Sequence, residues 1–444
     1  MAENSATIHH KPDSDPVPLR RPKPRPARFL QGIVPKLVAL AAGVAAGLGL
    51  YASVSSASRP SGMPGTVAQV RVAGNELVSA SGQRMVLRGV DRSGTEYECV
   101  QGHAIFDGPS GQVSVSAMRS RGINAVRIPL NEACWNGESY VKPAYAGARY
   151  RAAIQAYVRR LNANGMVAIV DLHWTDGAYT GNTSACSSAE ATCQKPMPDA
   201  AQAVPFWTSV ARTFKGNDAV IFDLFNEPYP ERADGGNLTE GWQCWRNGGS
   251  DCVGIPYRVA GMQTLVNAVR STGASNVIML GGLEWSNDLT GWLSHEPIDP
   301  NRNLVASWHS YNFNACSTRS CWTSQIAPVT AKIPLIAEEI GENDCAHTYI
   351  GSLMSWLNSK SASYLAWAWN TDFDCASGPG LITSYTGTPT AYGAGYESEL
   401  QMLDPHSTRP RRLSGQSASR RRYARTRLVQ PHGDSPPGDL RQCL

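Results

Sequence analysis

Short apolar segments recur eight times between residues 85 and 369, and this repetition restricts the fold of the chain more than any other feature. Each segment is rich in β-branched or aromatic residues, which is typical of a strand buried on both faces. The segments are Met85–Val90, Ile123–Leu130, Met166–Leu172, Ala219–Leu224, Val277–Leu280, Leu304–Trp308, Pro334–Ala337 and Tyr364–Trp369. The spacing between them leaves room for a helix after most strands, so the pattern favours a parallel sheet.

Three of the intervening segments carry a helical pattern of apolar residues. The three stripes are Ile154, Tyr157, Val158 and Leu161, closed by Gly165; Phe206, Val210 and Phe214, before Gly216; and Val259, Met262, Val266 and Val269. Eight alternations of strand and helix predict a (β/α)8 TIM barrel, as a single catalytic domain. A doubly wound sheet fits less well because no glycine-rich phosphate-binding turn follows the first segment.

Polar, titratable and aromatic residues lie near the ends of most of these segments. In a (β/α)8 barrel the active site gathers at the C-terminal ends of the strands, so we expect these side chains to meet. They are Arg127, Asp171, His173, Trp174, Asn226, Glu227, His309, Tyr311, Glu338, Glu339, Trp367 and Trp369.

Two carboxylates that face each other across such a rim are what hydrolysis of a glycosidic bond requires. One protonates the leaving oxygen, and the other attacks the anomeric carbon. Glu227 and Glu339 follow or lie at the ends of the fourth and seventh predicted strands, and they are the natural pair. We expect Arg127, with His309 and Tyr311, to hold the nucleophile ionised and oriented.

Several of these residues also have competing interpretations. Glu338 is the rival of Glu339, but neighbours on a regular strand point to opposite faces, so only one of the two should face the site. Arg127 could instead form a structural ion pair with Asp171 or Asp223. Three further assignments stay open: Trp367 or Trp369 as an apolar platform for a sugar ring, His173 and His309 as buried structural residues, and Glu227 as a surface carboxylate.

The chain resembles glycoside hydrolase family 5 and the wider clan of retaining barrel glycosidases. The matching motifs are Leu87-Arg88-Gly89-Val90, Asn124-Ala125-Val126-Arg127-Ile128-Pro129, Asp171-Leu172-His173-Trp174, Phe222-Asp223-Leu224-Phe225-Asn226-Glu227-Pro228, His309-Ser310-Tyr311, Pro334-Leu335-Ile336-Ala337-Glu338-Glu339-Ile340-Gly341 and Trp367-Ala368-Trp369-Asn370. The resemblance implies that Glu227 is the general acid/base and Glu339 the nucleophile. It also implies a surrounding substrate-binding and supporting set: Arg127, His173, Asn226, His309, Tyr311 and Trp367.

Composition changes at both ends of the chain mark segments outside this domain. We expect a disordered basic arm at 1–32, a signal peptide or membrane anchor at 33–58, a linker at 59–69, the barrel at 70–403 and a disordered Arg-rich tail at 404–444. Residues 1–59 hold eight Lys and Arg against three Asp and Glu, and residues 401–444 hold nine against three. The overall charge of +4 therefore leaves −7 on residues 60–400, which disfavours a nucleic-acid partner.

Ten of the eleven cysteines lie within residues 99–375, and several are close together in sequence. No Cys-x-x-Cys or Cys/His cluster suggests zinc, and loop cysteines at this spacing favour disulfides in an exported protein. The close pairs are Cys186 with Cys193, Cys244 with Cys252 and Cys316 with Cys321; Cys99 with Cys134 and Cys345 with Cys375 would complete five, although the sequence leaves connectivity open. Cys443 is left over in the tail.

The function expected from these features is that of a retaining endo-β-1,4-glucanase that hydrolyses internal bonds of a polysaccharide by double displacement. The same chemistry on β-mannan, xyloglucan or β-1,3-glucan is the first alternative, and a non-catalytic surface carbohydrate-binding protein is the second. We expect no cofactor or metal, a monomer, and a location outside the cell or on the outer face of its membrane, with an N-terminal tether as one option.

Overall fold

The computed structural model describes residues 69–181 and 186–403. The predicted basic arm, the export segment, nearly all of the linker and the Arg-rich tail with Cys443 lie outside the described residues. Within the described ranges, no helix combines the length and apolarity that crossing a bilayer requires.

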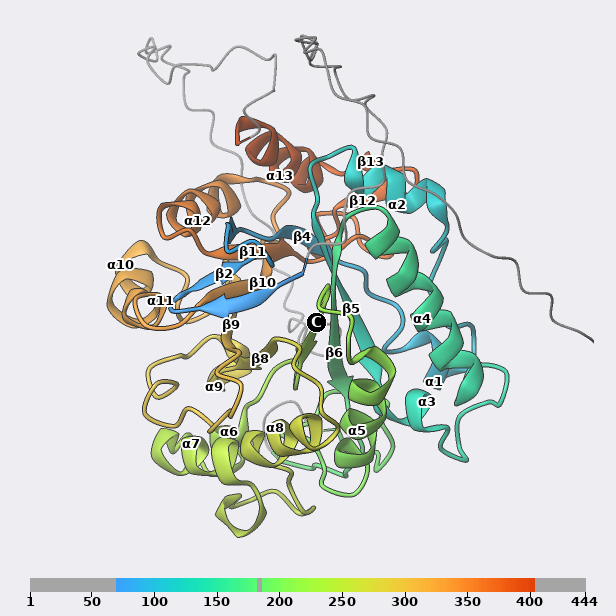
Figure 1. The fold of residues 1–444 in the computed structure, drawn as a ribbon, viewed down its shortest axis with the longest axis vertical. Helices are drawn as coiled ribbons and strands as arrows, with labels where there is room; N and C mark the ends of the chain where they lie inside the picture. The colour runs from blue at the N-terminus through green and yellow to red at the C-terminus, as the bar shows by residue number, and fades with distance from the viewer. Residues whose placement is uncertain (1–68, 182–185, 404–444) are drawn as a thin grey trace, which may run out of the picture. The chain divides into compact units, whose positions relative to one another are not determined.

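Eight parallel strands close into a barrel, which confirms the predicted (β/α)8 fold (Figure 1). Each strand pairs with its neighbours in chain order, and β11 pairs with β4 to complete the circle. The barrel strands are β4 (Arg88–Asp91), β5 (Ala125–Asn131), β6 (Val167–Trp174), β7 (Val220–Asp223), β8 (Ile278–Gly281), β9 (Leu304–Tyr311), β10 (Leu335–Gly341) and β11 (Ser363–Ala366).

Every predicted segment overlaps one barrel strand, because a strand covered on both faces is largely apolar. The boundaries differ at several segments: β9 and β10 extend to Tyr311 and Gly341, beyond the predicted ends at Trp308 and Ala337. Met85 belongs to a separate short strand, and β11 ends at Ala366, so Trp367 and Trp369 lie beyond the strand, on the segment that leaves the barrel.

Helices surround the strands, as Figure 1 shows for α2, α4, α5, α8 and α12. The helices are α1 (Glu98–Gln101), α2 (Gln112–Arg119), α3 (Glu132–Asn136), α4 (Ala148–Ala163), α5 (Ala203–Phe214), α6 (Pro230–Ala233), α7 (Leu238–Asn247), α8 (Met262–Ser271), α9 (Leu283–Ser286), α10 (Arg319–Cys321), α11 (Ala327–Thr330), α12 (Thr348–Ser359) and α13 (Ala391–Met402). The predicted stripes of α4 and α5 are buried, whereas Val259 precedes α8 instead of belonging to it.

A small antiparallel sheet covers the N-terminal end of the barrel. It consists of β1 (Arg71–Ala73), β2 (Glu76–Val78) and β3 (Arg84–Met85). Leu77 of β2 packs in one apolar cluster with residues that begin the barrel strands, among them Ala125 and Val167. This floor seals one end of the barrel, so only the opposite end is open for chemistry. A two-stranded sheet, β12 (Ile382–Ser384) with β13 (Thr388–Pro389), follows β11.

Five disulfides are formed, and they are the five pairs considered from the sequence. They join Cys99 to Cys134, Cys186 to Cys193, Cys244 to Cys252, Cys316 to Cys321 and Cys345 to Cys375. All ten cysteines lie in the segments that follow the C-terminal ends of barrel strands. The disulfides therefore brace the face of the barrel opposite the floor.

Candidate active site

Arg127 of β5 lies at the centre of the open end of the barrel and is fully buried. Its guanidinium is within 3.1 Å of four carboxylates, and its Nη2 also donates to Asn226 Oδ1 at 2.7 Å. The four carboxylates are those of Asp91, Asp171, Asp223 and Glu339. The structural pairing of Arg127 with Asp171 and Asp223 is therefore present together with the contact to Glu339.

Glu339 of β10 accepts a hydrogen bond on each carboxylate oxygen. Arg127 Nη1 lies 2.7 Å from Oε1, and the hydroxyl of Tyr311 donates to Oε2 at 2.6 Å. Both contacts fix the orientation of the carboxylate. Gly341 makes room for this arrangement, because a Cβ atom at that position would lie 2.7 Å from the Tyr311 ring.

Glu227 follows β7 and has different partners. His309 Nδ1 lies 2.8 Å from Oε1, and Gln194 Nε2 donates to Oε2 at 2.9 Å. Burial raises the pKa of Glu227, whereas the hydrogen bond from Gln194 acts to lower it. The two glutamates thus have different hydrogen-bonding partners: a guanidinium and a phenol for Glu339, and an imidazole and an amide for Glu227.

His309 of β9 lies beside three carboxyl groups, those of Glu227, Glu338 and Glu339. Its Nδ1 faces Glu227, and its Nε2 lies 3.2 Å from Glu338 Oε1. Burial lowers the pKa of His309 to about 3, so the ring is neutral and has one N–H to donate. The other ring nitrogen must then accept from a protonated carboxyl group. Burial raises the pKa of Glu338 well above its usual value, which makes Glu338 a suitable donor.

The expectation that only one of Glu338 and Glu339 faces the site is wrong. The pairing register of β10 shifts between Ile336 and Glu339 against β9, and between Ala337 and Ile340 against β11. This irregularity interrupts the alternation of faces, so both side chains are buried and both approach His309. Only Glu339 contacts Arg127 and Tyr311.

One donor atom each from Glu227, His309 and Glu339 lies within 4.8 Å of the other two. This trio does not fit a metal site, because both oxygens of Glu339 already bind Arg127 and Tyr311. The Nδ1 atom of His309 likewise faces Glu227. The arrangement is instead a hydrogen-bonded carboxylate pair beside a permanent positive charge.

Aromatic rings form one wall of the site. His173 stacks on Trp367 with 5.6 Å between ring centroids, and its Nδ1 lies 2.7 Å from Asp171 Oδ2. Trp367 also clusters with Tyr311. Trp369, the competing platform, lies in the main hydrophobic core, and its Nε1 donates to Ser114. Of the two tryptophans, only Trp367 joins the site.

A left-handed turn after β8 packs against the segment that carries Glu227. Glu284, Trp285 and Ser286 have φ values of 54°, 57° and 61°, which are unfavourable for residues other than glycine. The turn is held by hydrogen bonds from Trp285 N to Pro228 O and from Ser286 Oγ to Asn226 O, and Trp285 stacks on Tyr229. Strained backbone that is held in this way is common beside functional groups.

The structure brings together the eight residues assigned to the site from the sequence, adds Asp91 and Gln194, and places Glu338 beside them. Asp91 directly follows the first predicted segment, so the rule that located the other rim residues would have found it. Glu338 was assigned to the wrong face. Gln194 stands in an irregular loop after Cys193, and no sequence pattern marks it.

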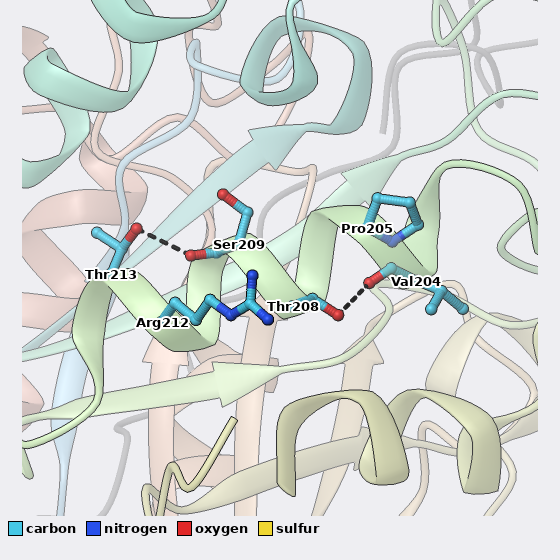
Figure 2. A pocket seen from close by; sticks show the side chains of 6 residues that line it. All are labelled: Val204, Pro205, Thr208, Ser209, Arg212 and Thr213. Atoms are coloured by element: carbon cyan, nitrogen blue, oxygen red, sulfur yellow. Dashed lines mark hydrogen bonds between the residues drawn. The ribbon is translucent and has the colours of Figure 1, made fainter. Parts of the chain in front are cut away.

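A hollow on the outer face of α5 is unrelated to this site (Figure 2). Its six lining residues all belong to α5. The hydroxyls of Thr208 and Thr213 donate to carbonyls of their own helix, as the dashed lines in Figure 2 show, so they are not free to bind a ligand.

Comparison with known proteins identifies relatives of the barrel. The cellulase model of glycosyl hydrolase family 5 matches residues 78–373. The chain is 27% identical over 274 residues to beta-mannanase/endoglucanase A of Caldicellulosiruptor saccharolyticus, a match that covers 57% of this chain and 17% of that protein. It is 24% identical over 375 residues to a probable endo-beta-1,4-glucanase B of Neosartorya fischeri, covering 77% of this chain and 98% of that protein.

Among solved structures, a beta-glucanase from Saccharophagus degradans in complex with cellotetraose has a similar fold. Its TM-score is 0.58 at 18% sequence identity, over 76% of this chain and 94% of that one. At this identity the likeness concerns the fold alone.

Proposed function

The chain belongs to glycosyl hydrolase family 5, and from that membership we propose that it is a retaining endo-β-1,4-glucanase in which Glu339 is the nucleophile and Glu227 the general acid/base. The observation that carries the proposal is the pair of carboxylates whose facing oxygens lie within 4.8 Å. Retaining enzymes separate the two groups by about 5–5.5 Å, whereas inverting enzymes need about 6.5–9.5 Å to admit a water molecule.

In the first step, Glu339 attacks the anomeric carbon and Glu227 gives its proton to the departing oxygen. Arg127 and Tyr311 hold the two oxygens of Glu339 and orient the carboxylate before the attack. The bond between the sugar and the leaving chain breaks as the bond to Glu339 forms.

In the second step, water enters the place of the leaving chain. Glu227, now ionised, takes a proton from that water, and the resulting hydroxyl group displaces Glu339 from the anomeric carbon. Two inversions return the original configuration of the anomeric carbon.

Three further residues would bind or support the sugar. Trp367 supplies the apolar surface under the sugar ring, and His173 holds Trp367 by stacking on it. Asn226 lies beside the acid/base, where it would meet the 2-hydroxyl group of the sugar.

We propose residues 70–403 as the catalytic unit and the outside of the cell as its place of action. Five disulfides support export, because such bonds persist in oxidising compartments. The same proposal includes a monomeric state and, as one option, an N-terminal membrane tether. Beta-mannan is the second candidate substrate, and the mannanase activity in the name of one relative favours it.

The test is release of reducing sugar from soluble β-1,4-glucan and β-1,4-mannan by the full-length protein, beside its Glu227→Gln, Glu339→Gln and Glu240→Gln variants. Glu240 is an exposed carboxylate of α7 and serves as the control. We expect the first two changes to lower kcat by about 10²–10⁴-fold or more, and the control to change little. Activity on mannan alone would replace the substrate and keep the mechanism. Binding of either polymer without hydrolysis would favour a carbohydrate-binding role. Initial release of the α-anomer, observed by NMR, would contradict retention.

A further inference from the structure

Gln194 approaches the proposed acid/base from a loop that no sequence motif marks. Its side chain comes from the segment between β6 and α5 and is half-buried. The amide Nε2 donates to Glu227 Oε2 at 2.9 Å and to the main-chain oxygen of Glu227 at 3.2 Å. One amide group thus holds both the side chain and the backbone of Glu227.

The loop that carries Gln194 is itself tightly held. Cys193, the preceding residue, is disulfide-bonded to Cys186. The following residue, Lys195, is buried, and its ammonium group donates to the carbonyl oxygens of Ser188 at 2.9 Å and Glu190 at 3.1 Å. These contacts close the loop from both sides of Gln194.

The loop is also fixed to the barrel and to the segment after β7. Asn131 at the end of β5 donates from Nδ2 to Ala191 O at 2.7 Å. Tyr229, two residues after Glu227, donates its backbone N–H to Pro196 O at 3.0 Å and its hydroxyl to Gln194 O at 3.3 Å. The position of Gln194 relative to Glu227 is therefore set from three directions.

We propose that Gln194 is a positioning residue for Glu227 and that the Cys186–Cys193 disulfide holds it in place. The inference rests on the proposed function, because it assigns Gln194 a task only if Glu227 is the acid/base. The task is to orient the carboxyl group and to keep its ionised form accessible for the second step.

The charges around Glu227 show why such a donor is useful. Glu227 faces His309 on β9, His173 and Asp171 on β6, Arg127 on β5, Glu339 with Tyr311 across the site, and Tyr229 on its own segment. Burial lowers the pKa of both histidines to about 3, so neither brings a positive charge at neutral pH. Burial raises the pKa of Glu227 and so favours its protonated form. A neutral N–H donor offsets that effect without adding a charge.

The first experiment measures kcat/KM against pH for the wild type and for Gln194→Leu, with Gln263→Leu as the control. Gln263 lies on α8, where its amide bonds only Asn267 and Ile298. Loss of the donor should raise the pKa of Glu227, so the alkaline limb should move up by roughly 0.5–1 pH unit, the size expected for one hydrogen bond. A Gln194→Glu variant puts a second carboxyl group at the same distance and should move the limb further in the same direction.

A second readout separates positioning from general damage. An aryl β-cellobioside with a dinitrophenolate leaving group needs no proton when its bond breaks, whereas an unsubstituted phenolate does. Gln194→Leu should therefore lower kcat/KM for the poor leaving group by about tenfold or more, and for the good one much less. Equal losses on both substrates would overturn the positioning role.

The disulfide has its own matched comparison. The double variant Cys186→Ser/Cys193→Ser should reproduce the shift seen for Gln194→Leu, and Cys244→Ser/Cys252→Ser should not. The two bonds close loops of similar length, with sequence separations of 7 and 8, but only the first adjoins Gln194. An unchanged alkaline limb in Gln194→Leu, in an active enzyme that needs Glu227, would refute this inference. Full activity of Glu227→Gln would instead refute the proposed function.

Discussion

Six carboxyl groups surround a single guanidinium at the open end of the barrel. Asp91, Asp171, Asp223 and Glu339 contact Arg127, and Glu227 and Glu338 adjoin the cluster through His309. One positive charge cannot compensate six negative charges among buried side chains, so several of the groups must hold protons. Burial raises the pKa of Asp171 to about 7 and that of Asp223 to about 8.

Because some of these carboxyl groups are protonated in the folded protein, its stability depends on pH. Folded Asp223 keeps its proton up to about pH 8, whereas the unfolded side chain releases it near 3.8. The stabilisation is complete below the unfolded value and disappears as the pH rises through the folded one. We therefore expect the Tm of the wild type to fall between pH 5 and pH 8, and Asp223→Asn to flatten that slope. Calorimetry at several pH values tests this, and an identical slope in the variant would contradict it.

The two adjacent glutamates of β10 should respond differently to substitution. Glu338→Gln can still donate to His309 Nε2, so we expect less than about tenfold loss of kcat. Glu338→Ala leaves a buried ring nitrogen without its partner, at a cost of about 1–3 kcal/mol. Assays of kcat for both Glu338 variants beside Glu339→Gln determine which of the two glutamates is the nucleophile. A Glu338→Gln enzyme as inactive as Glu339→Gln would transfer the role of nucleophile to Glu338.

The same pair shows how far sequence reasoning reaches at the level of single residues. Glu227, Arg127 and His309 were found because they are polar residues within or shortly after the apolar segments that form the barrel strands. Glu338 was misplaced because a register shift in β10 depends on pairing with both neighbours, and no local pattern records it. Gln194 was missed because its approach to Glu227 depends on contacts between segments distant in sequence, such as those that Asn131 and Tyr229 make with its loop.

At the level of elements, the two ends of the barrel have separate tasks. The apolar strands were predictable because their burial on both faces leaves a nearly continuous signal, and the helices α4, α5 and α8 because one face of each is apolar. The floor sheet, β1 to β3, was not predicted, since its strands are two or three residues long. Its side chains belong to the stability of the barrel and lie away from the chemistry.

Leu77 of the floor should therefore matter for stability alone. It is 3% exposed and packs among the first residues of the barrel strands. We expect Leu77→Ala to lower the free energy of unfolding by about 2–5 kcal/mol and to leave kcat/KM unchanged at temperatures well below Tm. Denaturant unfolding and steady-state kinetics on one preparation provide the measurement. A fall in kcat/KM of the folded variant would show that the floor communicates with the site.

At the level of the whole molecule, the covalent bonds are concentrated on one face. All five disulfides join segments that follow barrel strands, and within the described residues no cysteine lies in the floor. These segments combine short helices with irregular backbone, such as the left-handed conformation of Cys345, whose φ is 57°. The cross-links join these short pieces to one another.

The length of each cross-linked loop predicts its contribution to stability. The Cys345–Cys375 bond spans 30 residues and the Cys316–Cys321 bond spans 5. Loop-closure entropy assigns them about 3.6 and 2 kcal/mol, so Cys345→Ser/Cys375→Ser should destabilise the protein more than Cys316→Ser/Cys321→Ser. Denaturant titration of the two double variants under oxidising conditions measures the difference, and the opposite order would contradict the loop-length argument.

The placement of the disulfides also decides how the protein should be produced. In a reducing bacterial cytoplasm the chain would have to fold without these cross-links, several of which lie in the hydrophobic core, and the loss of all five would lower its stability more than the loss of any single pair. In such material the rim around Glu227 would lack its braces. The specific activity of such a sample would then depend on how many of its disulfides had formed. Only periplasmic or secretory expression, where disulfides form, would give the full specific activity of the enzyme.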